Sequence, residues 1–312
     1  MSVIYKRVAL IGLGLLGSSI AWAARRAGVV GEIVGTARSA ETRARAEELD
    51  FCDDIVGTPE EAVRDADLVI LCVPVGACGP IMQAIAPHLA EGATVSDVGS
   101  VKRAVITAMA PHVPPHAHFI PAHPMAGTEH SGPDAGFAEL FDNRWCLMTP
   151  MPDASADAVE KLQRFWQALG ADTQTMDPDH HDLVCAVTSH VPHAIAYTMC
   201  GVADDMKRVT EQEIVQFSAA GFRDFTRIAA SDPTMWRDVF LTNREATIEI
   251  LGRFVEELMA LQRAIRTGDG DFLHEYFTRT RAIRRSIIEA GQDTAAPNFG
   301  RSNETSKPQW DG

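Results

Sequence analysis

Two stretches of this 312-residue chain carry residues whose types and spacing could do chemistry. The first is the run GLGLLG at residues 12–17, in which Gly12 permits a tight turn and Gly14 lets the backbone approach a pyrophosphate. Gly17 would then allow close packing of a helix on a strand. The second is His123, which ends a short apolar run next to proline and can accept a proton near neutrality as a general base.

The elements around the glycine turn give it a context that a lone motif lacks. An apolar run at Val8–Ile11 predicts a strand before the turn, and residues 18–26 predict a helix after it, whose N-terminus would offer N–H groups to phosphates. Further strands are predicted at Ile33–Val34, Leu68–Val73, Thr94–Ser96, Phe119–Ile120 and Trp145–Thr149. Because these runs are apolar and alternate with helical stretches, we expect an α/β Rossmann-type domain with a parallel sheet covered on both faces.

The residues after the second predicted strand bear on the choice of cofactor. An acidic residue about 20 positions beyond the glycines would bind the ribose 2′-hydroxyl and favour NAD. The sequence has Arg38 and Ser39 there and no acid, which favours NADP through its 2′-phosphate. The alternative, in which Arg38 stacks on adenine and either cofactor binds, stays open. The predicted cofactor contacts are Gly12, Leu13, Gly14, Leu15, Leu16, Gly17, Arg38, Ser39, Val73 and Pro74.

The remainder of the chain has a helical pattern. We expect a dinucleotide-binding domain at residues 1–176, an all-α domain at 177–291 and a disordered tail at 292–312. Apolar residues at helical spacing within 251–265 indicate a core or a subunit interface. The run His180–Asp182 is expected to be a solvated first helical turn.

Composition excludes several classes of partner. With 28 basic and 42 acidic residues, the net charge of −14 argues against nucleic acid and anionic membrane surfaces. We see no signal peptide and no apolar run near the roughly 18 residues that span a bilayer, so a cytoplasmic location is expected. The six cysteines include no Cys-x-x-Cys pair and predict buried thiols. A zinc site would have to draw on His180, His181, Asp182, His190 and His193, but their spacing matches no established ligand pattern, so no metal is expected.

Five motifs, taken in order, resemble the prephenate/arogenate (cyclohexadienyl) dehydrogenase family. They are the glycine turn, DVGSVK at 97–102, HPMAGTE at 123–129, SHVPH at 189–193, and GFRDFTRIA at 221–229 followed by DPTMW at 232–236. The resemblance covers roughly residues 5–290. It implies NAD(P)-dependent oxidative decarboxylation of prephenate to 4-hydroxyphenylpyruvate, of arogenate to tyrosine, or of both, in tyrosine biosynthesis. It also implies a homodimer formed through the helical domain.

The resemblance further implies roles for single residues. His123 would take the 4-hydroxyl proton while the C4 hydride moves to the nicotinamide, and Ser100 would hydrogen-bond to His123 or to that hydroxyl. Arg227 would bind a substrate carboxylate through a bidentate fork. The other predicted pocket residues are His190, His193, Trp236 and Glu129. Alternatives remain: Arg223 or Arg227 could simply pair with Asp224, and the two pocket histidines could shape a helix kink at the proline between them.

Two other functions share parts of this pattern. Another two-domain Rossmann dehydrogenase, acting on β-hydroxyacids or imino acids, would share the glycine turn but has no reason to carry residues 123–127 together with Arg227. A non-catalytic NAD(P)-sensing protein would need neither a base nor a carboxylate anchor near the nicotinamide. The conjunction of the turn, the base and the arginine therefore favours the dehydrogenase of tyrosine biosynthesis.

Overall fold

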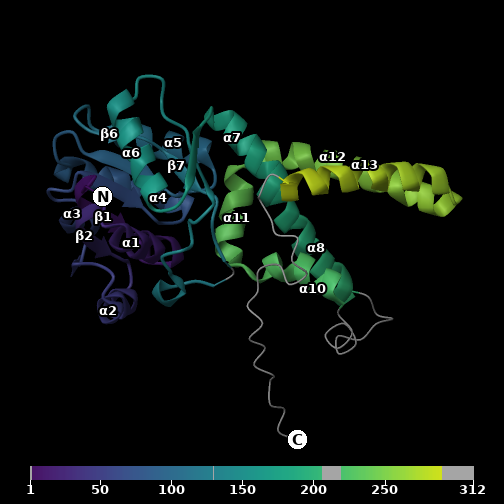
Figure 1. The fold of residues 1–312 in the computed structure, drawn as a ribbon, viewed down its shortest axis with the longest axis horizontal. Helices are drawn as coiled ribbons and strands as arrows, with labels where there is room; N and C mark the ends of the chain where they lie inside the picture. The colour runs from purple at the N-terminus through teal and green to yellow at the C-terminus, as the bar shows by residue number, and fades with distance from the viewer. Residues whose placement is uncertain (1, 129, 206–218, 290–312) are drawn as a thin grey trace, which may run out of the picture. The chain divides into compact units, whose positions relative to one another are not determined.

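The computed structural model describes residues 2–128, 130–205 and 219–289 (Figure 1). The chain forms two compact units, residues 1–250 and 251–312. The predicted tail lies outside the described residues. Every described residue of the candidate site belongs to the first unit.

Six parallel strands form the main sheet of the first unit, in the order β3-β2-β1-β4-β5-β6. They are β1 (Tyr5–Ile11), β2 (Val30–Thr36), β3 (Asp54–Ile55), β4 (Leu68–Leu71), β5 (Thr94–Asp97) and β6 (His118–Phe119). Val8 of β1 pairs with Ile33 of β2 on one side and with Leu68 of β4 on the other. The strand order reverses between β1 and β4, and the carboxyl ends of strands at such a point form a ligand-binding crevice. The predicted Rossmann-type domain is therefore confirmed.

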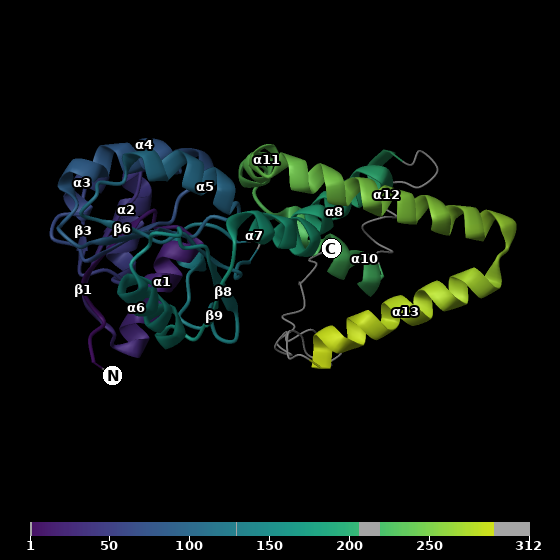
Figure 2. The same cartoon turned by 90° about the horizontal axis from the view of Figure 1, so that it is seen from above.

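Alternate residues of the central strands β1 and β4 enter two separate cores. Val8 and Leu10 join the core on one face, and Ala9 and Ile11 join the core on the other. The first face is covered by α1 (Leu15–Ala27), α2 (Ala40–Leu49) and α6 (Ala156–Ala168), and the second by α3 (Pro59–Ala62), α4 (Val75–Ile85) and α5 (Lys102–Met109). Figure 2 shows α3, α4 and α5 along one side of the sheet and α1 and α6 along the other. Because both faces are covered, the central strand β4 is apolar and buried throughout.

A smaller sheet of three strands follows the main one. Its strands are β7 (Ala122–Pro124), β8 (Trp145–Met148) and β9 (Asp172–Thr175), with β7 antiparallel and β9 parallel to β8. Of these strands the apolar pattern predicts only β8, since β7 is three residues long and β9 is polar. The strand that the pattern misses, β7, is the one that carries His123.

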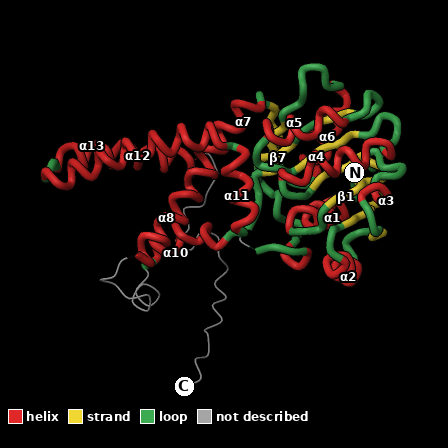
Figure 3. Tube along the Cα trace, turned by 180° about the vertical axis from the view of Figure 1, so that it is seen from behind, coloured by secondary structure: helices red, strands yellow, loops and turns green. Residues whose placement is uncertain are grey.

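Every regular element described after β9 is helical (Figure 3), which confirms the predicted fold of this region. These elements are α7 (Pro178–Cys185), the short π-helix η4 (Ala186–His190), α8 (Val191–Asp205), α10 (Ala220–Thr226), η5 (Arg227–Ala230), α11 (Pro233–Thr242), α12 (Arg244–Thr267) and α13 (Gly270–Glu289). Short 3₁₀ turns earlier in the chain are η1 (Ala86–His88), η2 (Ala110–His112) and η3 (Pro133–Ala135). Asp177 caps α7, because its carboxylate accepts the N–H groups of Asp179 and His180. The domain limits at residues 176 and 291 stay a prediction.

One helical stretch among the described residues, Pro178–Asp205, is long and apolar enough to cross a membrane by length and composition alone. The expectation that no such run exists is therefore wrong for this stretch, where single polar residues are scattered among apolar ones. A core helix of a globular domain passes the same test. Here the stretch carries His181, Asp182 and His190, all buried and hydrogen-bonded to other described residues.

Candidate active site

The glycine turn has a shape that follows from its three glycines. Gly12 has a φ of +106°, and a Cβ on it would lie 2.3 Å from the carbonyl oxygen of Cys72. A Cβ on Gly17 would lie 2.0 Å from the carbonyl oxygen of Gly12, so the turn and α1 pack closely. A Cβ on Gly14 would meet nothing within 4 Å, and no side chain caps the start of α1. The turn therefore offers open space and uncapped N–H groups, which fit the pyrophosphate of a dinucleotide.

The other predicted cofactor contacts lie at the carboxyl ends of β2 and β4. Arg38 follows β2, is exposed, and makes no side-chain hydrogen bond or ion pair with a described residue. Ser39 caps α2, because its hydroxyl accepts a backbone N–H from the first turn. Val73 packs beside Gly12, and Pro74 directly precedes α4. Of the remaining predicted contacts, Leu13 is buried in the core, and Leu15 and Leu16 are half-buried.

His123 is held in place through its own strand and through a buried lysine. β7 pairs with β8, with His123 opposite Leu147. The ammonium group of Lys102 donates to the carbonyl oxygen of Ala122 and to Asp97 Oδ2, at 2.6 Å for the latter. Lys102 and Asp97 are fully buried, and breaking a buried pair costs roughly 3–5 kcal/mol. The end of β5, the start of α5 and the strand of His123 are thereby fixed together.

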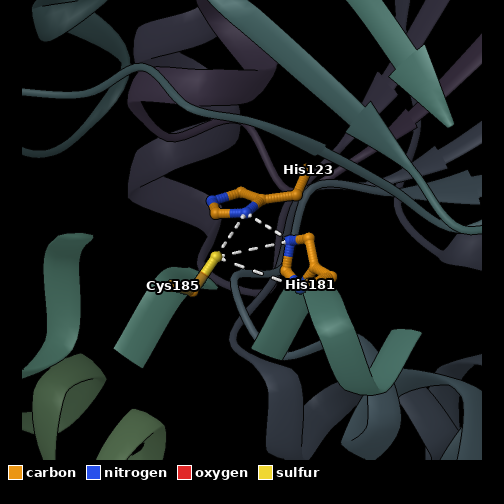
Figure 4. Close-up of side chains that lie close together, drawn as sticks. All are labelled: His123, His181 and Cys185. Atoms are coloured by element: carbon orange, nitrogen blue, oxygen red, sulfur yellow. Dashed lines mark hydrogen bonds between the residues drawn. The ribbon is translucent and has the colours of Figure 1, made fainter. Parts of the chain in front are cut away.

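Helix α7 presents two side chains to His123. His181 and Cys185 are four residues apart and so lie on one face of the helix. His181 Nε2 lies 2.9 Å from His123 Nδ1, and Cys185 Sγ lies 3.6 Å from the same His123 nitrogen. Figure 4 shows the other ring nitrogen of His123, Nε2, pointing away from both. It makes no hydrogen bond with a described residue, so it is available to a ligand.

Asp182, next to His181, joins α7 to α5. Its Oδ1 accepts the backbone N–H of Lys102 at 2.7 Å, and its Oδ2 accepts that of Arg103 at 3.0 Å. None of the residues at the start of α5 provides a side-chain cap, so Asp182 supplies it. The expected solvated turn is therefore wrong for His181 and Asp182, which are buried against α5, and right only for the exposed His180.

Burial keeps the histidines of this cluster uncharged near neutral pH. The pKa of His123 lies well below its usual range, mainly because the ring is desolvated and also because of His181 and Lys102. Burial lowers the pKa of His181 too, although its hydrogen bond to Asp182 opposes the shift. Burial lowers the pKa of His190 to about 4. A neutral imidazole can accept a proton, so His123 has the charge state that a base requires.

A second set of aromatic rings adjoins the cluster. The short π-helix η4 ends at His190, and single π-helical turns of this kind are frequent at functional sites. Asn243 Nδ2 donates to His190 Nδ1 at 3.0 Å and to the carbonyl oxygen of Asp182 at 2.8 Å. His190 Nε2 is buried without a hydrogen-bond partner among the described residues. His193 stacks on Trp236, with ring centroids 3.7 Å apart.

Three predicted site residues are less closely tied to this cluster. Ser100 is half-buried in the loop between β5 and α5, and its hydroxyl makes no hydrogen bond with His123 or another described residue. Arg227 is exposed at the start of η5. Burial lowers the pKa of His193, and the positive charge of Arg227 adds to that lowering. The turn η5, which begins at Arg227, packs against α8, the helix that carries His193. Glu129 lies outside the described residues.

The structure adds five residues that the sequence did not single out as functional. They are Lys102, His181, Asp182, Cys185 and Asn243. The only local signal was the i, i+4 spacing of His181 and Cys185, which one helical stretch alone cannot distinguish from chance. All six cysteines are free; the predicted burial holds for Cys52, Cys78, Cys146 and Cys185, whereas Cys72 and Cys200 are half-buried. The thiol of Cys185 contacts the site instead of serving only as core.

The His123, His181 and Cys185 ligand atoms form the one group within the described residues that could hold a metal ion. Two nitrogens bound to one Zn²⁺ at about 2.0–2.1 Å would lie about 3.3–3.4 Å apart. The observed separation of 2.9 Å between the two nitrogens is that of a hydrogen bond. The geometry therefore favours a hydrogen-bonded cluster, and the expectation of no metal stays a prediction.

Comparison with known proteins connects this geometry to a family. Residues 20–175 match the model of the prephenate dehydrogenase nucleotide-binding domain, and residues 177–279 match that of the prephenate dehydrogenase dimerization domain. The cyclohexadienyl dehydrogenase of Zymomonas mobilis is 40% identical over 91% of this chain and 97% of its own length. The prephenate dehydrogenase of Bacillus subtilis is 31% identical over 94% of this chain and 78% of its own length.

Solved structures agree with these relatives. The prephenate dehydrogenase of A. aeolicus, in complex with hydroxyphenyl propionate and NAD⁺, superposes with a TM-score of 0.83 at 31% identity, over 90% of this chain and 98% of that one. The arogenate dehydrogenase of Synechocystis has a TM-score of 0.75 at 26% identity, over 90% of this chain and 99% of that one. The two family models together cover the Rossmann-type and helical regions, and the curated relatives and solved structures each extend over both regions. The chain therefore belongs to the prephenate dehydrogenase family of nicotinamide-dependent oxidoreductases.

Proposed function

We propose that His123 is the base that accepts the 4-hydroxyl proton of prephenate, arogenate or both. As a family member the chain is an NAD(P)-dependent dehydrogenase that carries out oxidative decarboxylation in tyrosine biosynthesis. Bound NAD(P)⁺ supplies the acceptor for the C4 hydride, and loss of the ring carboxylate as CO₂ forms the aromatic ring. Relatives named for cyclohexadienyl, prephenate and arogenate substrates make acceptance of both acids the expectation.

The observation that carries the proposal is the state of the His123 ring. Burial keeps it neutral, the bond from Nδ1 to His181 fixes its orientation, and Nε2 makes no hydrogen bond with a described residue. A positioned base of this kind contributes roughly 10²–10⁴ to the rate. We place the substrate hydroxyl at Nε2 and assign Ser100, at the end of the neighbouring β5 loop, as a hydrogen-bonding partner of that hydroxyl.

The remaining side chains of the cluster would hold the substrate. Asn243 donates to His190 Nδ1, so the hydrogen of this neutral ring lies on Nε2, a buried donor without a partner among the described residues. We assign that donor to a substrate oxygen, and the stacked rings of His193 and Trp236 to the pocket wall. Arg227, on the turn that packs against the helix of His193, would bind a carboxylate.

The choice of cofactor rests on Arg38. The relative from A. aeolicus was solved with NAD⁺, while this chain reads Ala37-Arg38-Ser39 directly after β2, with an exposed arginine and no acid. We propose that NADP is accepted and slightly preferred through a contact between Arg38 and the 2′-phosphate. Arg38→Ser should lower kcat/KM with NADP by roughly tenfold and leave NAD within twofold. Equal losses with both cofactors would indicate adenine stacking instead.

The assembly proposed is a homodimer, since residues 177–279 match a dimerization domain. Large apolar side chains of the second unit are exposed in the single chain; examples are Leu258, Ile265, Phe277 and Ile283. Exposed apolar side chains in this number are typical of a subunit interface. Light scattering of the purified protein tests the dimer. A cytoplasmic location stays part of this proposal.

The test of the proposed function is the absorbance change at 340 nm with prephenate or arogenate and NAD or NADP. Reduction in at least one combination is expected. His123→Asn should lower kcat by at least about 100-fold and leave the NAD(P) Kd unchanged. His180→Asn, at an exposed histidine beside the cluster, is the matched control and should keep wild-type turnover. Near-normal turnover of His123→Asn would remove His123 from the mechanism.

A further inference from the structure

A chain of hydrogen bonds leads from a helix-capping carboxylate to His123. Asp182 Oδ1 lies 2.8 Å from His181 Nδ1. His181 Nε2 in turn lies 2.9 Å from His123 Nδ1, the contact drawn in Figure 4. We infer that His181 and Asp182 are positioning residues, which hold His123 in the one tautomer whose Nε2 can accept the substrate proton. This inference rests on the proposed role of His123 as the base.

The donor and acceptor in each of these hydrogen bonds follow from the chemistry of Asp182. The Asp182 oxygens accept the N–H groups of Lys102 and Arg103 at the N-terminus of α5, where a negative charge is favoured. A carboxylate only accepts hydrogen bonds, so His181 Nδ1 must carry a hydrogen. A neutral imidazole carries a single ring hydrogen, which leaves His181 Nε2 bare. His123 Nδ1 must then donate to it, and His123 Nε2 is left bare in turn.

The opposite arrangement is disfavoured by the same distances. If His181 carried its hydrogen on Nε2, its bare Nδ1 would face a carboxylate oxygen 2.8 Å away, lone pair against lone pair. A neutral imidazole free in water prefers its hydrogen on Nε2, which is the wrong tautomer for a base that uses Nε2. The fold thus imposes on His123 a tautomer that it would not adopt alone, as second partners of histidine commonly do.

The same hydrogen bonds also act after His123 has accepted the substrate proton. The substrate O–H bond breaks, an N–H bond forms at His123 Nε2, and no other proton needs to transfer. The positive charge that develops on His123 is met through Nδ1 by His181, a ring already polarised by the carboxylate of Asp182. The same three residues therefore orient the base before the reaction and stabilise its charged form afterwards.

Cys185 provides a matched control within the same cluster. Its sulfur lies 3.6 Å from His123 Nδ1 and 3.5 Å from His181 Nε2, so it touches both rings from the next turn of α7. A thiol is only a weak donor and acceptor, and the chain of hydrogen bonds does not need it. Cys185→Ala should therefore disturb packing around the rings without changing either tautomer.

The direct test is long-range ¹H–¹⁵N NMR of the imidazole rings in protein labelled with ¹⁵N-histidine. In the wild type, His123 and His181 should both carry the hydrogen on Nδ1, with signals assigned by their loss in His123→Asn and His181→Gln. In His181→Phe, His123 should revert to the Nε2–H form, and in Cys185→Ala it should not. A wild-type His123 with its hydrogen on Nε2 would overturn the inference.

Kinetics give a second readout. His181→Phe should lower kcat roughly 10–100-fold, less than the roughly 10⁴ lost where a catalytic histidine is locked in the wrong tautomer, because His123 can still visit the right one. KM and the NAD(P) Kd should stay within threefold. His181→Gln has an amide oxygen that can accept from His123 Nδ1, and it should recover at least fivefold. Equal rates for the phenylalanine and glutamine variants would contradict the positioning role, since a loss of packing alone predicts no such rescue.

His123→Asn separates a failure of this inference from a failure of the proposed function. Normal turnover of His123→Asn, with the expected tautomers in the wild type, would refute the base and leave the hydrogen-bond chain standing. An inactive His123→Asn, with the wild-type His123 hydrogen on Nε2, would refute the chain and leave the base standing.

Discussion

The glycine turn at residues 12–17 and the cluster around His123 reach their geometry by opposite routes. In the turn, glycines permit a positive φ and a helix that starts against the strand, all within six consecutive residues. In the cluster, His123 comes from β7, His181 and Asp182 from α7, and Asn243 from the end of α11. A single methyl group at Gly12 or Gly17 should therefore break the turn, whereas the cluster should respond to the loss of charges and hydrogen bonds.

Gly17→Ala tests the packed side of the turn and should have the largest effect. Its new Cβ would lie 2.0 Å from the carbonyl oxygen of Gly12, a backbone atom that cannot turn aside as a side chain can. Such overpacking costs roughly 1–3 kcal/mol of stability, and the displaced turn should raise the Kd for NAD(P) at least about 100-fold. Urea unfolding and titration calorimetry measure the two quantities. A wild-type Kd would show that the turn does not depend on close packing.

Arg227→Ala tests the cluster by removing a charge. A charge-assisted hydrogen bond to a substrate carboxylate is worth about 1.5–3 kcal/mol, so KM should rise roughly 10–100-fold while kcat changes less than threefold. Arg223→Ala, one turn earlier and also exposed, is the matched control and should leave KM near the wild-type value. Should the two variants behave alike, Arg227 is not the carboxylate anchor.

The same contrast explains what could be predicted from the sequence. The strand Val8–Ile11 and the glycine turn follow from local residue types, and both are present as expected. His181 and Asp182 were expected to be solvated because they lie with His180 in the polar first turn of a predicted helix. Their burial depends on α5, which lies about 80 residues earlier in the chain. The start of α5 has no side-chain cap of its own, and Asp182 of α7 supplies one. No local pattern encodes that contact.

The pH dependence of stability should come from the cluster and not from the turn. The pKa values of His123, His181 and His190 are lowered in the folded chain, mainly by burial. The unfolded chain therefore binds more protons below about pH 6.5, and the stabilisation, complete above that pH, is lost as the pH falls toward the folded values. For His190, whose folded pKa is about 4, this amounts to roughly 1–2 kcal/mol between pH 7 and 5.

Urea unfolding at pH 7 and pH 5 checks this, with His190→Gln as the variant. Glutamine does not titrate, so the variant should lose less unfolding free energy than the wild type between the two pH values. The difference should be the roughly 1–2 kcal/mol attributed to His190. Gln174, a polar residue exposed on β9, offers the control variant Gln174→His, which should add almost no pH dependence because an exposed histidine titrates alike in both states. An identical pH dependence in His190→Gln and the wild type would mean that His190 is solvated in the folded chain.

Gly14→Ala should have the smallest effect on the fold and sharpens the contrast within the turn itself. A Cβ there meets nothing within 4 Å, and the residue has a φ of −83°, which alanine adopts without strain. The unfolding free energy should therefore change by less than about 0.5 kcal/mol, as for most substitutions that touch nothing. The methyl group would instead occupy the space in which the backbone approaches the pyrophosphate, so the Kd for NAD(P) should rise about tenfold. If Gly14→Ala destabilised the chain as much as Gly17→Ala, the open side of the turn would be serving the fold, and the assignment of that side to the cofactor would lose its support.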